Sequence, residues 1–344
     1  MKILMIGLGG VGQRHLRNLR TILGDTAMIA AYRVRRNALV LTDQLKEEHG
    51  SSLEDKYNIS VFDNLDDALA WGPQIAIVCN PSSLHIPTAL AVARAGCHLL
   101  IEKPLSISLD GVDLLNNIVE EKKLVALVAY QLRFHPCLRR AHTLLQENCI
   151  GKVIAVRSEV GEYLPDWHTY EDYRTMYASR KELGGGVVLS QIHEMDYLYW
   201  FFGLPQRVFA LGGHLSSLEI DVEDTASILM DCGGVPVHVH QDYVQRPGRR
   251  NLQIIGDAGK VLVDLRTSSI EVFNQAGQLC EEQAWSGFQR NQLFIDELNH
   301  FLACVAGQEK PMVSLRDGAQ SLRMALAAKK SMTTGDVVRL GEDK

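Results

Sequence analysis

The chain has 344 residues, of which 46% are hydrophobic and 22% charged, and its formal net charge is −6. This composition is typical of a globular protein of about two domains and excludes a disordered or collagen-like chain. The excess of acidic residues argues against a general nucleic-acid binder, and no apolar run is long enough to cross a membrane.

The N-terminal part of the chain alternates short apolar strands with helical segments. The expected strands are Lys2–Ile6, Ala27–Tyr32, Ile75–Cys79, His98–Ile101 and Leu124–Ala129, and the helices between them are Val11–Leu23, Ala38–His49, Leu84–Ala95 and Leu109–Lys122. Strands that alternate with helices of this length predict an α/β domain with a doubly wound parallel sheet. We assign this domain to residues 1–123.

The pattern changes near Tyr130. The expected helices are Pro136–Glu147, Gly185–Phe202, Gly287–Ala306 and Leu315–Ser331, and the expected strands are Val153–Val160, Val208–His214, Thr225–Asp231, Val235–Val244, Asn251–Gly256, Gly259–Asp264 and Ser269–Phe273. Consecutive strands joined by tight turns predict a large, mostly antiparallel sheet with one open face. Residues 124–344 thus form an α+β domain, whose final helices can pack back on the first domain.

A glycine-rich motif follows the first expected strand and opens the first expected helix. It reads Gly7-Leu8-Gly9-Gly10-Val11-Gly12, which matches G-x-G-x-x-G. In this context the glycines allow a tight turn and the close approach of a pyrophosphate, and the helix N-terminus supplies N–H donors to the phosphates. The motif therefore predicts a dinucleotide-binding site, the alternative being a purely structural turn.

A basic residue ends the second expected strand. Arg33, with Arg35 and Arg36 close behind, stands where an acidic residue would bond the ribose 2′-hydroxyl of NAD(H). A guanidinium can instead pair with the 2′-phosphate of NADP(H). We therefore favour NADP(H), and keep NAD(H) and a merely solvated basic loop as alternatives.

Glu102-Lys103-Pro104 follows the expected strand at residues 98–101. This places the motif at the carboxyl edge of the sheet, where ligands of open α/β sheets bind. Pro104 restricts Lys103 to an extended backbone, and the Lys103 ammonium could donate to a substrate hydroxyl or transfer its proton beside the nicotinamide. The alternative is a surface ion pair of little energetic value.

Taken together, the motifs resemble those of the Gfo/Idh/MocA oxidoreductases, relatives of glucose–fructose oxidoreductase and inositol 2-dehydrogenase. The resemblance rests on the glycine motif, the segment Cys79-Asn80-Pro81-Ser82-Ser83-Leu84-His85, the Glu102-Lys103-Pro104 motif and Gly184-Gly185-Gly186 leading to a His and an Asp. It implies a Rossmann domain followed by an α+β domain whose open sheet often forms a dimer or tetramer interface.

The resemblance also implies roles for particular residues. Lys103 corresponds to the lysine that binds substrate and transfers a proton, and His193 to a histidine facing the substrate. Asn80, Pro81 and His85 match the segment beside the nicotinamide and ribose, with Glu102 and Lys103 also at the cofactor. Ser190 stands where an Asp is common, so that Lys103 and His193 would carry proton transfer largely alone.

His193 can also be considered from its own surroundings in the sequence. Ser190, His193 and Asp196 or Tyr197 share one face of the expected helix, on an otherwise apolar segment. This polar stripe indicates a helix that faces a cleft, and a histidine suits reversible proton transfer. The alternative is a core histidine bonded to a neighbour.

Residues 163–174 are rich in aromatic and hydrogen-bonding side chains. Such loops suit sugars, which have apolar C–H faces and polar edges. A similar loop occurs in the branch of the family associated with amino sugars and sialic-acid-like substrates. We therefore expect substrate contacts from Tyr163, Trp167 and Arg174, together with Arg133, Ser190 and His193. The alternative is a packed structural loop or a subunit contact.

Seven scattered cysteines without a Cys-x-x-Cys pair, and a start without a signal-peptide pattern, predict a cytoplasmic protein with reduced thiols. His238 and His240 share one face of an expected strand, but further metal ligands are missing from the pattern, and we expect no metal. The basic run at residues 245–250 is typical of a surface hairpin turn, and it could reach an anionic substrate from a neighbouring subunit.

The function expected from these features is hydride transfer between a nicotinamide cofactor and a sugar or amino-sugar derivative. One alternative is a transient oxidation that enables elimination, hydrolysis or epimerisation, with the cofactor regenerated in each turnover. A second alternative is a non-catalytic dinucleotide sensor, which would have no need of Lys103 and His193.

Overall fold

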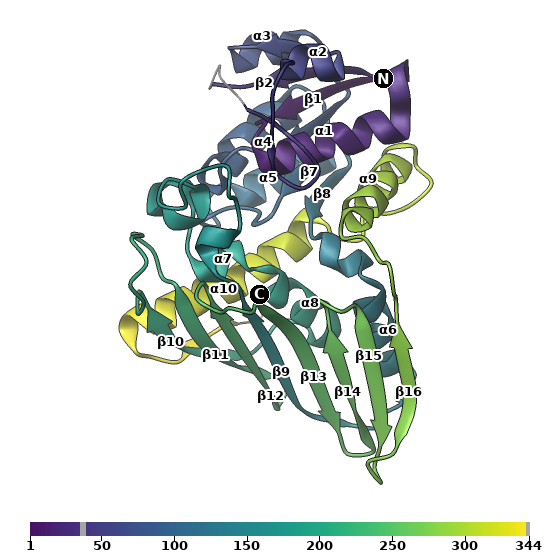
Figure 1. Ribbon diagram of the computed structural model, residues 1–344, viewed down its shortest axis with the longest axis vertical. Helices are drawn as coiled ribbons and strands as arrows, with labels where there is room; N and C mark the ends of the chain where they lie inside the picture. The colour runs from purple at the N-terminus through teal and green to yellow at the C-terminus, as the bar shows by residue number, and fades with distance from the viewer. Residues whose placement is uncertain (35–38, 342–344) are drawn as a thin grey trace.

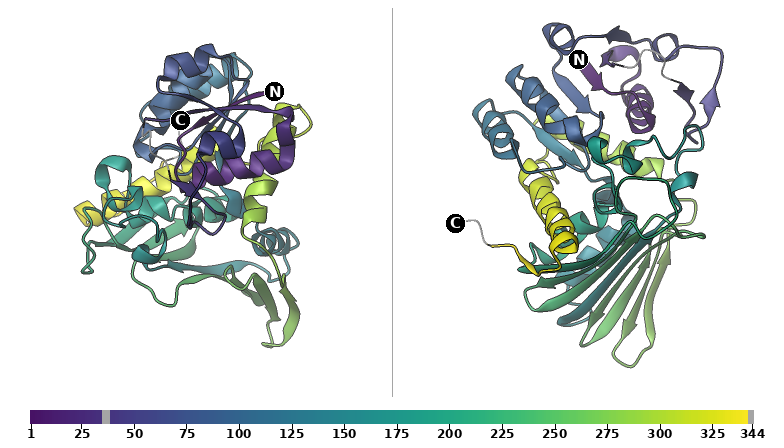
Figure 2. Two further views of the ribbon diagram at one scale, coloured as in Figure 1. Left: turned by 45° about the horizontal axis from the view of Figure 1, so that its top comes forward. Right: turned by 90° about the vertical axis from the view of Figure 1, so that its left-hand side faces the viewer.

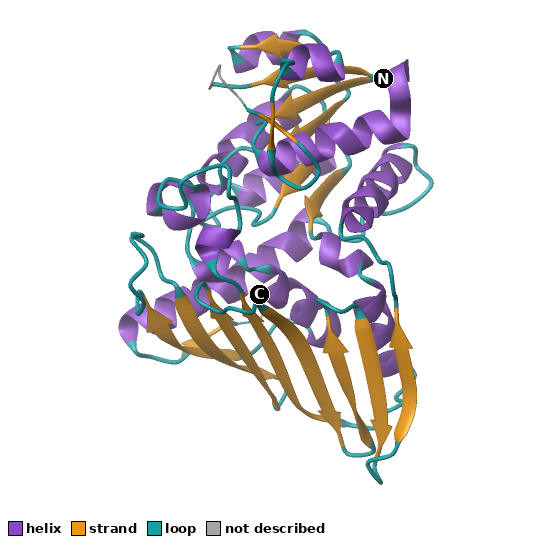
Figure 3. Cartoon of the chain, viewed as in Figure 1, coloured by secondary structure: helices purple, strands orange, loops and turns teal. Residues whose placement is uncertain are grey.

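The computed structural model describes residues 1–34 and 39–341. Over these ranges the chain forms a six-stranded sheet, a nine-stranded sheet and a two-stranded ribbon. Figure 1 shows the six-stranded sheet, built from the N-terminal residues, above the broad nine-stranded sheet. Figure 3 shows that helices fill the space between the two sheets.

The first sheet is entirely parallel and has the strand order β5-β2-β1-β6-β7-β8. Its strands are β1 (Lys2–Ile6), β2 (Met28–Tyr32), β5 (Ser60–Phe62), β6 (Ile75–Val78), β7 (His98–Glu102) and β8 (Ala126–Ala129). The predicted doubly wound sheet is thus confirmed, and β5 is an additional edge strand. Because β8 pairs with β7, this sheet extends beyond the expected domain boundary at residue 123.

The helices of the first domain are α1 (Gly10–Leu23), α2 (Leu53–Tyr57), α3 (Leu65–Ala70), α4 (His85–Arg94) and α5 (Val112–Glu121). Residues 3–6 of β1 are all 0% exposed. A parallel strand of this kind is covered on both faces, which is why it reads as an unbroken aliphatic run.

The helix expected over residues 38–49 is wrong. The described part of that segment is the antiparallel ribbon of β3 (Val40–Leu41) and β4 (Glu47–Glu48). The side-chain amide of Gln13 on α1 donates to the Leu39 carbonyl at 2.7 Å and accepts from the Leu41 N–H at 2.8 Å. These bonds engage backbone groups that a helix would need, so a tertiary contact outweighs the local helix propensity.

The second sheet has the order β16-β15-β14-β13-β9-β12-β11-β10-β17 and is antiparallel except for the β9–β12 pair. Its strands are β9 (Val153–Gly161), β10 (Arg207–Gly213), β11 (Thr225–Cys232), β12 (Val235–Asp242), β13 (Arg249–Gly256), β14 (Gly259–Asp264), β15 (Ser269–Asn274), β16 (Leu279–Ala284) and β17 (Val338–Arg339). The mostly antiparallel sheet is confirmed, and the edge strands β16 and β17 were not predicted.

The second-domain helices are α6 (Pro136–Gln146), α7 (Val187–Ser190), α8 (His193–Phe202), α9 (Asn291–Val305) and α10 (Leu315–Thr334). The single helix expected over residues 185–202 is therefore two helices. At the break, the carbonyl of Gln191 accepts from the side chain of Gln241 at 2.6 Å, and the Gln191 side chain donates to the Asp242 carbonyl at 3.1 Å. The break separates Ser190 from His193, so the expected continuous polar stripe is not formed.

Helices cover one face of the nine-stranded sheet, and Figure 2 shows the opposite face without a helix. On that face Leu211 is 62% and Leu229 is 50% exposed. Helix α9 packs elsewhere, because its Leu298 and Phe301 complete the core beside β1 of the first domain. None of the helices in the described ranges has the length and apolar character needed to span a membrane.

Candidate active site

The glycine motif forms a tight turn between β1 and α1. A methyl group on Gly12 would lie 2.2 Å from the Gly7 carbonyl oxygen, and one on Gly7 would lie 2.8 Å from the Cys79 carbonyl oxygen. Gly7 also has a φ of 91°, a value that favours glycine. In contrast, a methyl group on Gly9 would meet nothing within 4 Å, which leaves the outer side of the turn open to a ligand.

The N-terminus of α1 offers donors to an anion. Its N-cap residue Gly9 provides no capping side chain, and no acidic residue lies in the first helical turn. The first N–H groups of a helix have no partner within that helix and carry partial positive charge. Leu8 is buried and Val11 packs against the core, so these two residues anchor the turn. This cradle fits a dinucleotide pyrophosphate.

Arg33 follows β2 at the same edge of the sheet. Its guanidinium pairs with Glu54 of α2, while its Nε atom is buried and, among the described residues, has no hydrogen-bond partner. A second anion could therefore approach the guanidinium. Arg36 and its neighbour Arg35 lie outside the described residues.

The segment after β6 lies at the carboxyl edge as well. His85 bridges two loops, because its Nδ1 lies 2.8 Å from the Pro104 carbonyl and its Nε2 2.8 Å from the Asn80 carbonyl. Asn80 donates to Thr88 at 2.9 Å, but its buried Oδ1 has no partner in the described part of the chain. This orphaned acceptor suits a ligand hydroxyl, whereas His85 supports the loop that carries Pro81.

Lys103 links the two domains. It follows β7, and its Nζ donates to the backbone carbonyl of Ser190 at the end of α7, at 2.7 Å. Burial lowers the pKa of Lys103 to about 8; the Glu102 carboxylate opposes this shift, and the positive charges of Arg250 and Arg290 add to it. A substantial neutral fraction exists near pH 8, so Lys103 can take up as well as release a proton.

Glu102 is held beneath Lys103. Its carboxylate accepts from His15 Nε2 at 2.7 Å and from the Lys103 backbone N–H at 3.1 Å. Burial acts to raise the pKa of Glu102, but the His15 hydrogen bond and the charges of His15 and Lys103 outweigh it, so that the pKa lies below its ordinary value. Glu102 therefore stays charged and fixes the loop.

His193 begins α8 close to Lys103. Its Nε2 lies 3.3 Å from the Gln131 side-chain nitrogen, and its buried Nδ1 has no partner among residues the structure describes. Burial lowers the pKa of His193 well below its ordinary value, and the charges of Lys103, Arg250 and Arg290 lower it further. The imidazole is therefore neutral, with one ring nitrogen available to a ligand.

The aromatic loop before α7 lies on the second sheet. The Trp167 ring contacts the edge of Tyr243, with centroids 5.3 Å apart, and the Trp167 Nε1 is buried without a partner in the described ranges. Tyr163 is covered by the guanidinium of Arg246, 3.8 Å from the ring centroid.

Two of the expected substrate contacts are engaged elsewhere. Arg133 is buried and makes a bidentate pair with Asp196, at 2.8 and 2.9 Å. Arg174 is exposed and binds Asp172 at 2.9 Å and Glu219 at 2.7 Å. Among the described residues, no hydrogen-bonded group links the Arg133 or the Arg174 guanidinium to Lys103.

The site includes residues that the sequence did not indicate. Gln131 contacts His193, and Arg290 at the start of α9 acts on both His193 and Lys103 by its charge. Arg250 makes a bidentate pair with the buried Glu194, at 2.8 and 2.9 Å. The basic run at residues 245–250 was a signal for Arg250, whereas no local pattern distinguishes Gln131 or Arg290.

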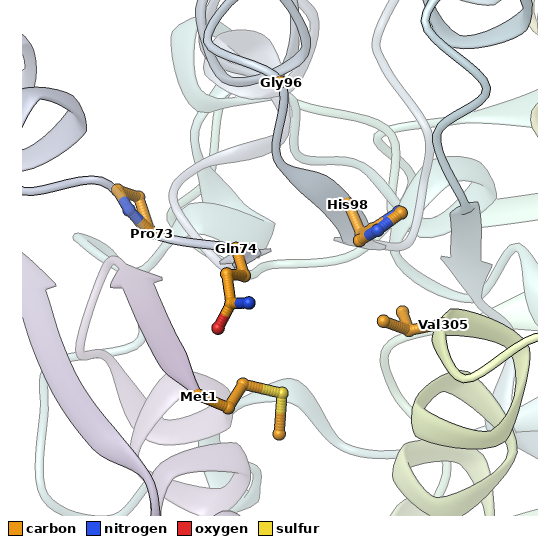
Figure 4. A pocket seen from close by; sticks show the side chains of 6 residues that line it. All are labelled: Met1, Pro73, Gln74, Gly96, His98 and Val305. Carbon is orange, nitrogen blue, oxygen red and sulfur yellow. The ribbon is translucent and has the colours of Figure 1, made fainter.

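A separate hollow of about 490 Å³ lies away from these residues (Figure 4). Its lining residues stand at or before the starts of β1, β6 and β7, or on α9; they are Met1, Pro73, Gln74, Gly96, His98 and Val305. The hollow is thus at the amino edge of the sheet, opposite Lys103. No group of three potential metal ligands occurs among the described residues, including the surroundings of His238 and His240.

Two family models match the chain. An oxidoreductase family with an NAD-binding Rossmann fold matches residues 1–130, and the GFO/IDH/MocA C-terminal domain matches residues 138–262. Myo-inositol 2-dehydrogenase from Thermotoga maritima is 26% identical over 354 residues, which cover 99% of each chain. The 2,7-anhydro-N-acetylneuraminate hydratase from Mediterraneibacter gnavus is 24% identical over 174 residues, which cover 50% of this chain and 45% of that protein.

Solved structures share the whole fold. Levoglucosan dehydrogenase, in complex with NADH and levoglucosan, superposes with a TM-score of 0.83 at 16% identity and covers 99% of this chain and 100% of that one. The WlbA dehydrogenase from Bordetella pertussis, in complex with NADH and UDP-GlcNAcA, gives a TM-score of 0.81 at 22% identity. The match covers 100% of this chain and 99% of that one.

Proposed function

Because the chain belongs to the Gfo/Idh/MocA family of NAD-binding oxidoreductases, we propose that it transfers a hydride between nicotinamide and a hydroxyl or carbonyl carbon of a sugar or amino-sugar derivative. The observation that carries this proposal is a set of buried polar side-chain atoms that have no partner among the described residues. They belong to the segments that follow β6 and β8, to the start of α8 and to the loop before α7. These are His193 Nδ1, Gln131 Oε1, Trp167 Nε1 and Asn80 Oδ1. Buried polar groups are normally bonded, so such a set suits a polyhydroxylated ligand.

The dinucleotide, when bound, supplies the hydride acceptor for oxidation and the hydride donor for reduction. Lys103 takes the proton of the substrate hydroxyl during oxidation, and its hydrogen bond to the Ser190 carbonyl holds the amine in place. Its pKa of about 8, lowered mainly by burial, suits a group that exchanges protons near neutral pH. In reduction the Lys103 ammonium returns the proton.

His193 assists as a neutral hydrogen-bonding group in this proposal. Its lowered pKa makes it a weaker proton acceptor than Lys103, although the sequence suggested that the two share proton transfer. The contact with Gln131 fixes the ring, so that Nδ1 can bind the reacting oxygen. Trp167 would lie against the sugar ring, for which an aromatic face is suited.

A substrate screen tests the function. We expect oxidation of a free or nucleotide-linked sugar or amino sugar with NAD⁺ or NADP⁺, followed as reduced nicotinamide and by analysis of the product. If neither dinucleotide is reduced, and no product forms from any sugar in either direction, the proposal is wrong.

A transient oxidation is the second candidate function, and Ser190 favours it. A hydroxyl at this position cannot act as the charged carboxylate that is common there. The partly similar hydratase makes a reaction without net oxidation worth testing. In that case product analysis in the same screen would show a converted sugar with no net accumulation of reduced nicotinamide.

The choice of dinucleotide is a further part of the proposal, and we expect a preference for NADP(H). The Nε of Arg33 is buried and has no hydrogen-bond partner in the described part of the chain, which supports contact with a 2′-phosphate. Replacing Arg33 with Ala should lower kcat/KM for NADP(H) by about 10- to 100-fold, because the loss of one or two charged hydrogen bonds weakens binding by about this factor. The kcat/KM for NAD(H) should change little.

Lys56→Ala is the matched control, because it removes another positive charge near Glu54 without touching Arg33. It should leave the ratio of kcat/KM values for the two dinucleotides unchanged. An unchanged ratio in Arg33→Ala would instead assign Arg33 to the structure of the loop alone.

We also propose that the open face of the second sheet forms a homodimer or homotetramer contact. Leu229 on β11 lies opposite Phe209 on β10 and His238 on β12, between the centre of this sheet and its β17 edge. Leu229→Lys should therefore convert the oligomer to monomer in light scattering after size exclusion, because a buried, unpaired charge is costly at an interface. Leu215→Lys, at an exposed loop position, should leave the mass unchanged.

A monomeric parent chain, or an unaltered mass in Leu229→Lys, would refute this contact.

The cytoplasmic location stays a prediction. Its support is that all seven cysteines are free thiols.

A further inference from the structure

A loop of the second domain reaches the glycine motif of the first. It joins β9 to α7, residues 162–186, and lies next to α1 in the views of Figures 1 and 2. A methyl group on Gly10 would lie 2.8 Å from the hydroxyl oxygen of Tyr170 in this loop, and 3.8 Å from the ring carbon that carries this oxygen. The phenol thus covers the first residue of α1.

The position of Tyr170 is supported by its neighbours. His168 stacks on its ring, with centroids 5.2 Å apart and an angle of 22° between the ring planes. The Nδ1 of His168 in turn lies 2.8 Å from Glu171 Oε1. The same methyl group on Gly10 would lie 3.4 Å from the Leu45 side chain, which belongs to the turn between β3 and β4. Gly10 therefore lies beneath two covering segments.

The Tyr170 hydroxyl is a donor at neutral pH. Burial raises the pKa of Tyr170, and the adjacent Glu171 carboxylate raises it further, so the phenol stays protonated. It lies above the point where the unpaired N–H groups of α1 begin, which is where a pyrophosphate binds. A phosphate oxygen there would be a charged acceptor for the O–H group, in competition with Glu171.

We propose that Tyr170 clamps the bound dinucleotide by donating a hydrogen bond to its pyrophosphate. The loop at residues 162–186 then has to move away from α1 before the dinucleotide can leave. This inference rests on dinucleotide binding and not on the identity of the substrate. Because Trp167 belongs to the same loop, release of the dinucleotide is linked to the substrate side of the site.

Binding of NADH and NADPH to the full chain tests the clamp without any substrate. Tyr170→Phe removes only the hydroxyl. For the preferred dinucleotide it should raise the Kd by about ten-fold, the value of a charged hydrogen bond, measured by nicotinamide fluorescence. Stopped-flow displacement should show that most of this change is faster dissociation. Thr169→Ala alters the neighbouring exposed residue and should change both quantities by less than about two-fold.

An unchanged Kd and dissociation rate in Tyr170→Phe would overturn the clamp, and tighter binding would do so as well, because the phenol would then obstruct the site.

Gly10→Ala checks the position of Tyr170 in the free protein. Gly10→Ala should lower the Tm more when it is made in the parent chain than when it is made in Tyr170→Phe. Without the hydroxyl, the atom of residue 170 nearest to the new methyl group is a ring carbon at 3.8 Å. Equal losses in both backgrounds would show that Tyr170 does not cover Gly10.

Discussion

Replacing Lys103 with Met should lower turnover by about 10³-fold, within the range that general acid–base groups contribute. Met has a similar length and no titratable group, so the change removes proton transfer with little effect on packing. The Kd for the dinucleotide should change by less than about three-fold, because the glycine motif is not touched. Steady-state kinetics and fluorescence titration measure the two effects separately.

The pH dependence of turnover tests whether Lys103 is the proton acceptor. Only the neutral amine accepts a proton, and burial lowers the pKa of Lys103 to about 8. Oxidative turnover should therefore rise with pH through about 8 and then level off. Reduction needs the ammonium, so its turnover should be nearly constant below this pH and fall above it. Lys103→Met should abolish this transition.

Lys122→Met, at an exposed position after α5, is the matched control and should retain full activity. If Lys103→Met keeps more than about a tenth of the parent turnover, Lys103 does not transfer the proton, and His193 becomes the remaining candidate.

Replacing Arg133 with Met should destabilise the protein by about 3–5 kcal/mol, since it leaves the Asp196 carboxylate buried without its partner. Arg133 and Asp196 have side chains that are 4% and 1% exposed, and both bonds of the pair are shorter than 3.0 Å. Burial already acts to raise the pKa of Asp196, which shows the cost of this charge. Urea unfolding followed by circular dichroism measures the loss.

Arg174→Met is the control, because it breaks only exposed ion pairs, with Asp172 and Glu219, which contribute little to stability. The double variant Arg133→Met/Asp196→Leu should recover much of the stability, because it removes both buried charges. If Arg133→Met is as stable as Arg174→Met and only the KM for the sugar rises, Arg133 binds substrate instead of holding the fold.

The parallel sheet and the cofactor turn could be predicted because their determinants are local. A buried aliphatic strand followed by spaced glycines allows few other structures. The ribbon at residues 40–48 could not be predicted, because its hydrogen bonds come from Gln13, distant along the chain. The strand β16 is also missing from the prediction, since most of its residues are exposed and give no alternating pattern.

The site shows the same division. Lys103 could be proposed from its position at the end of a strand, and His193 from the resemblance to a family; their roles stay predictions. Gln131 could not, because only its contact with His193 of the second domain distinguishes it, and Arg290 could not, because it acts on Lys103 and His193 only in the folded chain. Arg133 has the chemistry of a substrate ligand, but its partner Asp196 lies 63 residues away, and no sequence pattern shows that the two meet.

The position of α9 affects the order in which the protein can mature during its synthesis. Leu298 and Phe301 complete the core beside β1, and the N–H of Val128 on β8 bonds to the carbonyl of Val313. The first 130 residues therefore emerge from the ribosome long before the side chains that cover them. Until α9 is made, the apolar side chains of the first domain that contact Leu298 and Phe301 lack their cover, so this core is complete only after β9 to β16 have been translated.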